Sequence, residues 1–156
     1  MYEHILVPID GSGQAAKGLH EAIKLAISHQ GHIRLVHVLD RAPLASADLS
    51  GSRFDVLFER LREDGQQLLA RAEDCVRKAG VPVDAKLVDA TGGDPGEFIG
   101  QEASTWPADV IVCGTHGRRG LMRAIMGSEA EEIVRQSPVP VLMVPGCAAL
   151  DAATVR

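Results

Sequence analysis

The chain has 156 residues, of which 46% are hydrophobic and 24% are charged, which is the composition of an ordinary globular protein with a single domain. The formal net charge of −5 and an aromatic content of 3% argue against general binding to nucleic acid or to an anionic membrane. No apolar run approaches a membrane span and no signal peptide is visible, so we expect a cytoplasmic protein.

Strand-like and helix-like segments alternate along the whole chain. Short apolar runs predict strands, and apolar residues that recur every three or four positions predict amphipathic helices. In chain order we predict a strand at residues 4–9, a helix from 15 to 26, a strand at 32–38, a helix from 54 to 79, a strand at 83–88, a helix from 95 to about 106, a strand at 108–113, a helix at 128–136 and a strand at 139–144.

Local signals mark several boundaries of these elements. Gly80 and Pro82 end the long helix, and Asp94 followed by Pro95 and Glu97 predicts an N-cap, a proline at the first helical position and a capping glutamate. The polar stretch 40–53 is predicted to be a surface loop. Residues 1–146 form the expected domain, and residues 147–156 are expected to be a loose C-terminal tail.

This alternation predicts an α/β fold with a parallel sheet and helices on both faces, because parallel neighbours need crossover connections. Strand order does not follow from the pattern. In a doubly wound sheet of order 3-2-1-4-5, ligands bind where the order reverses. The end of the first strand, residues 10–13, would then face the end of the fourth, residues 114–117.

The segment from Gly114 to Ser128 is the most informative part of the sequence. It reads Gly114-Thr-His-Gly117, nine residues, and then Gly127-Ser128. We predict Ser128 as the N-cap of the following helix, with Glu131 completing a capping box. A strand that ends in glycines and leads to a helix N-terminus suits a phosphate. The alternative is that the glycines only make turns and Ser128 only caps.

A second glycine-rich loop follows the first strand. Residues 11–16, Gly-Ser-Gly-Gln-Ala-Ala, match a permissive dinucleotide-binding pattern, and Asp40 ends the second strand where a ribose-binding acid would lie. However, alanine replaces the third glycine, and Asp10 lies between strand and loop. The alternative is a strand-to-helix turn with Ser12 near the cap. A Walker-type phosphate loop is absent from the sequence.

Asp10 is the carboxylate most suited to ligand binding in the sequence, as an acceptor for a ribose hydroxyl or an indirect magnesium ligand. The alternative is an aspartate that bonds its own turn. Arg118, Arg119 and Arg123 could pair with phosphate oxygens or belong to a solvated loop. The histidines lack metal-ligand spacing, so no metal ligands are predicted, and no nucleophile–base pair is recognisable. Three widely spaced cysteines, at 75, 113 and 147, fit a reduced protein without disulfides.

The glycine spacing, the opening segment Ile5-Leu-Val-Pro-Ile-Asp-Gly-Ser12 and the closing segment Pro138-Val-Pro-Val-Leu-Met-Val144 together resemble the universal stress protein family. The resemblance covers residues 1 to about 145. It implies a Rossmann-like doubly wound sheet of five parallel strands in the order 3-2-1-4-5, usually in a dimer. The branch of the family with this glycine motif binds ATP or other adenine nucleotides.

Carried onto this sequence, the resemblance implies that Asp10 contacts ribose, that the Val38 backbone faces adenine, and that Gly127 and Ser128 hold phosphates. Glu129 stands where related sequences often have a small apolar residue, and it places negative charge near those phosphates. The predicted nucleotide-binding residues are Pro8, Asp10, Val38, Cys113, Gly114, His116, Gly117, Arg118, Gly127, Ser128 and Glu129.

We therefore expect a stress-response sensor or regulatory module that binds ATP, ADP or AMP, with Mg²⁺ as an accompanying ion. The alternatives are a slow ATP hydrolase or phosphotransfer protein, or a dinucleotide-binding redox protein that uses the first loop. We also expect a homodimer through the strand from Val139 to Val144. Its Pro140 cannot donate to a ladder and so favours an edge position, which leaves an apolar edge for a second copy.

Overall fold

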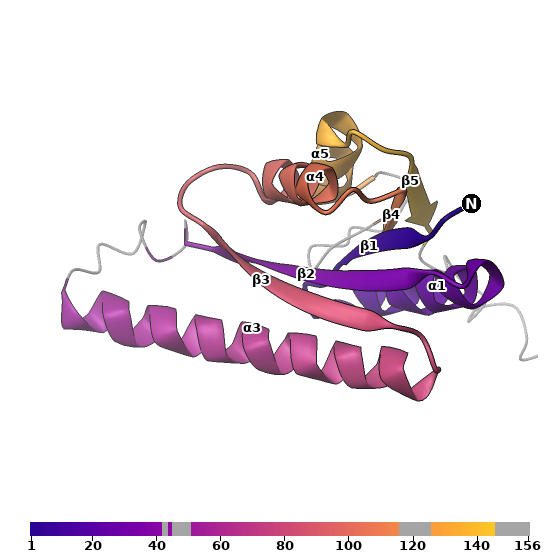
Figure 1. Ribbon diagram of the computed structural model, residues 1–156. Coiled ribbons are helices and arrows are strands. Elements are labelled where there is room, and N and C mark those ends of the chain that lie inside the picture. Colours follow the sequence, from indigo (N-terminus) through magenta and orange to yellow (C-terminus); the bar gives the residue numbers. More distant parts are fainter. Residues whose placement is uncertain (42–43, 45–50, 116–125, 146–156) are drawn as a thin grey trace, which may run out of the picture.

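The computed structural model describes residues 1–41, 44, 51–115 and 126–145 (Figure 1). Its elements are, in chain order, β1 (His4–Pro8), α1 (Gly13–His29), β2 (His32–Asp40), α3 (Ser52–Lys78), β3 (Val83–Ala90), α4 (Pro95–Thr105), β4 (Val110–Gly114), α5 (Ser128–Gln136) and β5 (Val141–Val144). The five strands form one parallel sheet in the order β3-β2-β1-β4-β5. The predicted doubly wound α/β fold is therefore confirmed.

Helices cover both faces of the sheet, with α1 and α3 on one face and α4 and α5 on the other (Figure 1). Successive residues of β1 supply both cores: Ile5 and Val7 pack toward α1 and α3, whereas Leu6 packs with Ile99 of α4 and Ile133 of α5. Because side chains of a strand alternate between faces, an unbroken apolar run such as that of β1 indicates a central strand buried on both sides.

Several strand ends differ from the prediction. β2 and β3 run on to Asp40 and Ala90, where residues Leu39 and Asp40 pair with Asp89 and Ala90. Backbone pairing does not require apolar side chains, so the ladder continues past the apolar runs from which the strand ends were predicted. β4 begins at Val110 instead of residue 108, because Ala108 still bonds back to the carbonyl of Ala103 in α4.

The N-caps of α1 and α4, Ser12 and Asp94, agree with the sequence, whereas Glu97 does not complete the predicted capping box, since its carboxylate accepts from the Gln101 side chain at 3.4 Å. Asp94 is the N-cap of α4 and accepts a hydrogen bond from the amide of Gly96, 2.8 Å away, with Pro95 at the first helical position. Residues 147–156, predicted as a tail, lie outside the described residues, as does most of the predicted loop at 40–53.

The long helix α3 extends past the carboxyl ends of the strands at its N-terminal end (Figure 1). Its C-terminal half supplies buried Leu69, Ala72 and Val76 to the core, whereas Leu57 and Leu61, nearer the N-terminal end, stay partly exposed. Among the described residues, no helix combines the length and apolar character needed to cross a membrane.

Candidate functional site

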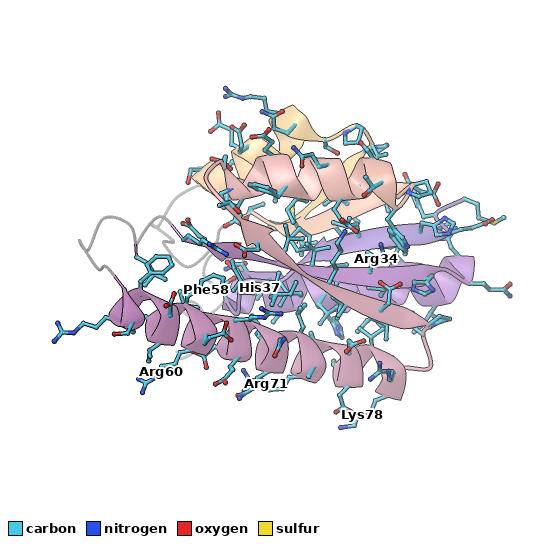
Figure 2. All side chains as sticks on the ribbon, turned by 60° about the vertical axis from the view of Figure 1, so that its left-hand side comes forward. Arg34, His37, Phe58, Arg60, Arg71 and Lys78 are labelled. Atoms are coloured by element: carbon cyan, nitrogen blue, oxygen red, sulfur yellow. The ribbon has the colours of Figure 1, made fainter. Side chains whose placement is uncertain are left out.

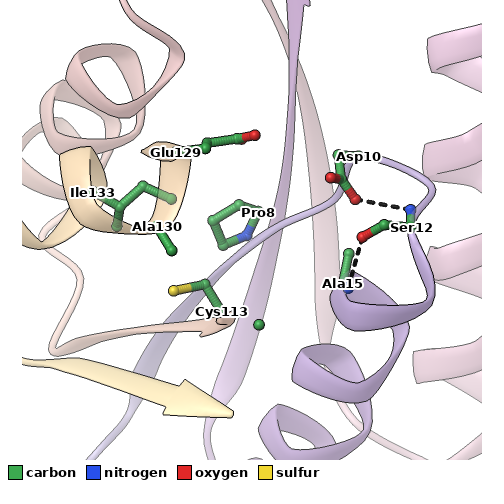
Figure 3. Close-up of a pocket in the computed structure, with 9 residues that line it drawn as sticks. Pro8, Asp10, Ser12, Ala15, Cys113, Glu129, Ala130 and Ile133 are labelled. Carbon is green, nitrogen blue, oxygen red and sulfur yellow. Dashed lines mark hydrogen bonds between the residues drawn. The ribbon is translucent and has the colours of Figure 1, made fainter. Parts of the chain in front are cut away.

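The first glycine-rich loop is a turn that starts α1. One carboxylate oxygen of Asp10 accepts a hydrogen bond from the Ser12 amide at 2.8 Å, and the Ser12 hydroxyl accepts one from the Ala15 amide at 3.1 Å (Figure 3). Gly11 takes a positive φ of 82°, which costs glycine little. The strand-to-helix turn alternative is thus confirmed, and the second oxygen of Asp10 remains available to accept from a ligand hydroxyl.

β1 and β4 are neighbours in the sheet, so the two glycine-rich segments lie at the same edge, as the 3-2-1-4-5 order requires. Gly114, at the end of β4, lies very close to α1. A Cβ there would stand 2.6 Å from the carbonyl oxygen of Gln14, which is backbone and cannot move aside easily. Gly114 therefore has a packing role that the motif alone did not reveal.

Hydrogen bonds bring the two described ends of the motif together. The amide of Thr115 donates to the carbonyl of Val144 at 3.0 Å, and the amide of Gly127 donates to the carbonyl of Thr115 at 2.7 Å. The segment between them thus begins and ends at the carboxyl end of β4. His116, Gly117 and Arg118, together with Arg119 and Arg123, lie outside the described residues.

The N-terminus of α5 corrects one prediction. Gly127, not Ser128, is the N-cap, Ser128 is the first helical residue, and no side chain caps this end. Glu131 does not complete a capping box, since its carboxylate pairs with Arg135 one turn further on, at 3.2 Å. The physical reason is the bond from Gly127 to Thr115, which fixes where the helix begins. Its first amides are thus left without a side-chain acceptor, which is the arrangement that binds anions.

Glu129, on the first turn of α5, turns its side chain into the hollow between the two loops, beside Pro8 and Cys113 (Figure 3). Burial raises the pKa of its carboxyl, and the charges of Asp10, Asp94 and Asp40 raise it further. Burial also raises the pKa of the Cys113 thiol to about 11, with a smaller contribution from Glu129.

The sequence-predicted residues converge on this edge of the sheet. A small pocket under Glu129 adjoins a cleft of about 1210 Å³ that widens toward α3. The described members of the predicted set line one or both of these hollows: Pro8, Asp10, Val38, Cys113, Gly114, Gly127, Ser128 and Glu129.

Other lining residues were not predicted as site residues. The α3 wall of the cleft carries Leu57 and Leu61 beside Arg60 and Arg71, and Figure 2 shows both arginines on this helix. The apolar stripe of α3 continues beyond the part of the helix that packs on the sheet. Apolar residues in this extension are the feature of the sequence from which the α3 wall of the cleft could have been predicted. Asp94 was predicted only as a cap, although its place after β3 puts it at the same edge of the sheet.

His37 joins the floor of this cleft to α3 (Figure 2). Its Nδ1 lies 2.6 Å from the carbonyl oxygen of Ile9. Because a carbonyl oxygen only accepts, Nδ1 carries the proton and donates this hydrogen bond. A Cβ at Gly65 of α3 would stand 2.8 Å from the imidazole, so the glycine lets the helix approach. Among the described residues, no group of three or more histidine, cysteine or acidic side chains could hold a metal ion.

The family model for universal stress proteins matches residues 1–145. The chain belongs to the universal stress protein family. A universal stress protein of Methanocaldococcus jannaschii is 31% identical over 144 residues, 92% of this chain and 82% of the relative. The solved hypothetical protein MJ0577 has a TM-score of 0.83 at 26% identity, covering 96% of this chain and 99% of that chain. A family member from Burkholderia pseudomallei has a TM-score of 0.73 at 29% identity, with coverages of 93% and 97%.

Three further universal stress proteins share the fold at 20% to 22% identity and were solved with bound nucleotides. One is a complex with cAMP, one from Archaeoglobus fulgidus is a complex with dAMP, and one from Arabidopsis thaliana has AMP bound. At this level of identity they establish the fold that they share with this chain.

Proposed function

We propose that this universal stress protein binds an adenine nucleotide at the carboxyl ends of β1 and β4 and acts as a regulatory module. The observation that carries the proposal is the N-terminus of α5, which lacks a side-chain cap and is held against the end of β4. Its amides would receive the phosphate, the second oxygen of Asp10 would accept from ribose, and the backbone of Val38 would face adenine. Adenine nucleotides in family members of the same fold support this choice.

Ligand identity is tested first on the purified protein. Denaturing the protein and analysing the released small molecules by mass spectrometry should give AMP, ADP, ATP or a cyclic adenine nucleotide. Calorimetric titration with ATP, ADP, AMP and NAD then ranks the ligands. Tighter binding of NAD than of every mononucleotide would favour the dinucleotide-binding alternative.

Two glycine variants test which of the two glycine-rich loops binds the phosphate. Gly127→Val should abolish nucleotide binding, because a β-branched side chain at the N-cap crowds the phosphate position. Gly13→Ala is the matched control, since a Cβ there meets no atom within 4 Å, and it should change affinity less than twofold. A larger loss in Gly13→Ala than in Gly127→Val would place the phosphate at the first loop instead.

A regulatory role predicts negligible catalysis. Asp10 already bonds its own turn, and the described lining residues include no nucleophile hydrogen-bonded to a base. ATP turnover should therefore remain well below the roughly 1–10³ s⁻¹ of ordinary enzymes. Several turnovers per second, lost in Asp10→Ala or His116→Ala, would identify an enzyme.

We further propose a homodimer through β5. This strand is at the edge of the sheet, and Leu142 on it is 44% exposed. Leu142→Lys should shift the dimer to monomer in sedimentation velocity at micromolar concentration. Val56→Lys, at an exposed site of α3, is the control and should not. Val144 on the same strand is unsuitable for this substitution, because it is buried in the core. A wild-type protein that sediments as a monomer would contradict the proposal.

A further inference from the structure

Glu129 differs from the other acids of α5 in having no partner. Glu131 pairs with Arg135, and Glu132 pairs with Gln136 and Arg135. Glu129, in contrast, is partly buried, and within the described part of the chain it has no hydrogen bond or ion pair. Its side chain points into the hollow beside Pro8 (Figure 3). An isolated carboxylate held in such a place lowers the stability of the fold. A role in ligand binding would explain why the chain carries one here.

Among the described residues, charged groups from four other segments of the chain face the hollow that Glu129 enters. Asp10 follows β1, Asp40 ends β2 and Asp94 caps α4, and the charge of each acts on Glu129. On the far wall of the same cleft, α3 presents Arg60, Asp64 and Arg71. These three are not among the groups that shift its pKa. Among the described residues, the charges that shift the pKa of Glu129 are therefore all acidic.

A helix N-terminus attracts a phosphate through two separate contributions. Its free amides donate hydrogen bonds, and its dipole acts as roughly half a positive charge. The full negative charge of Glu129, one residue into the helix, outweighs that half charge. The N-terminus of α5 therefore keeps its directional donors but loses its electrostatic attraction for highly charged anions.

We infer, on the basis of the proposed adenine-nucleotide site, that Glu129 makes this site select ligands by phosphate charge, so that AMP or cAMP binds ahead of ATP. A cyclic monophosphate carries about one negative charge, AMP about two and ATP about four at neutral pH. The amides of α5 can satisfy a single phosphate. Each additional phosphate adds repulsion from Glu129 and Asp10, whereas the described arginines that line the cleft, Arg60 and Arg71, lie on its α3 wall.

The test is a calorimetric comparison of adenosine, AMP, cAMP, ADP and ATP in EDTA, so that Mg²⁺ does not mask nucleotide charge. For the wild type, AMP should bind at least tenfold more tightly than ATP. Glu129→Gln, which keeps the side-chain shape, should raise ATP affinity at least tenfold and change adenosine affinity less than twofold. Glu131→Gln, two residues along the same helix, is the matched control and should leave the AMP to ATP ratio unchanged.

The outcomes separate this inference from the proposed function. ATP binding as tight as AMP in the wild type, or an unchanged ratio in Glu129→Gln, would overturn the inference while leaving an adenine-nucleotide site in place. Absence of binding by adenosine and every nucleotide would reject the proposed function itself. Glu129→Ala, checked by circular dichroism, provides a second variant should Glu129→Gln be poorly folded, and the same change in ratio is expected.

Discussion

At the amino ends of β2 and β3, Arg34 lies between two acids, whereas at the carboxyl end of the sheet Glu129 faces other acids. Arg34, which is labelled in Figure 2, donates two hydrogen bonds to Asp84, of 2.6 and 3.0 Å, and a third of 3.0 Å to Glu102. Lys86 completes the neutralisation of Glu102, which is only 5% exposed. Trp106 lies under the Arg34 guanidinium, 4.7 Å from it.

The pKa values of Asp84 and Glu129 shift in opposite directions, because Asp84 is paired with cations and Glu129 is close to other acids. Burial raises the pKa of Asp84, but the hydrogen bonds and charge of Arg34, and then those of His32, outweigh it, so the pKa lies below its ordinary value. Burial raises the pKa of Glu129 as well, and the neighbouring acids add to the shift. The difference indicates that the charge of Asp84 stabilises the fold, whereas the charge of Glu129 costs the fold some stability, in agreement with the ligand role that we propose for it.

Removing the charge of Glu102 should have the largest effect on stability. Glu102→Gln leaves Arg34 and Lys86 without their shared carboxylate, and we expect a loss of about 2 kcal/mol in the free energy of unfolding, less than for a fully buried pair because both cations reach solvent. Glu21→Gln removes an exposed partner of Lys24 and should cost far less, because solvent screens an exposed ion pair. Urea denaturation measures both. Equal losses in the two variants would show that the cluster does not stabilise the fold.

Asp84, at the amino end of the sheet, and Glu129, at its carboxyl end, should affect the pH dependence of stability with opposite signs. Asp84 has a lowered pKa, so it stabilises the fold above its ordinary value of 3.8 and loses this contribution as pH falls. Asp84→Asn should cost only about 0.5 kcal/mol at pH 7, because Asp84 is 40% exposed and solvent screens its pairs. Glu129 has a raised pKa, so its contribution is fully present below its ordinary value of 4.5 and is lost as pH rises. Glu129→Gln should therefore gain about 1 kcal/mol at pH 7.

The Glu129→Gln difference from the wild type should shrink between pH 7 and pH 4, whereas the Asp84→Asn difference should shrink only below its ordinary pKa of 3.8, and thermal unfolding from pH 7 to about pH 2.5 measures both. The protein must remain folded over this range for the comparison, which circular dichroism checks. A stability loss in Glu129→Gln at pH 7 would mean that its charge supports the fold, contrary to the contrast drawn between the two ends.

Ser128→Ala should have the smallest effect on the fold. Since the hydroxyl of Ser128 does not cap α5, stability should change by less than about 0.5 kcal/mol, well below the roughly 1 kcal/mol typical of a lost N-cap. Nucleotide affinity should still fall if the hydroxyl donates to phosphate. Calorimetry measures the change in nucleotide affinity, and urea denaturation of the same sample measures the change in stability. A stability loss of about 1 kcal/mol would support the prediction from the sequence that Ser128 is the N-cap.

Much of the fold could be predicted because its signals are local. Apolar runs mark the strands, and Asp94-Pro95 marks the start of α4 as observed. The order of the strands needed the resemblance, since pairing joins residues far apart in sequence. The cap of α5 was misplaced because the preference of serine for N-caps is weaker than the constraint that the Gly127 to Thr115 bond imposes.

The site could be predicted as a set of residues but not as an electrostatic environment. Glu129 was recognised as a charge near the proposed phosphates, yet the acids around it come from positions 10, 40 and 94, which only the folded sheet brings together. The pairing of Arg34 with Glu102 spans 68 residues and left no pattern in the sequence. The packing role of Gly114 likewise depends on how closely α1 approaches β4.

Cys113 forms one wall of the pocket, with its sulfur 3.5 Å from that of Met143. Thiols react with peroxide and alkylating agents as thiolates, and a pKa of about 11 leaves roughly one in ten thousand ionised at pH 7. Cys75, exposed on α3, is open to such reagents. Of the two described cysteines, an oxidant would therefore modify Cys75 on α3 before Cys113, so that the lining of the proposed ligand site would be the later of the two to change.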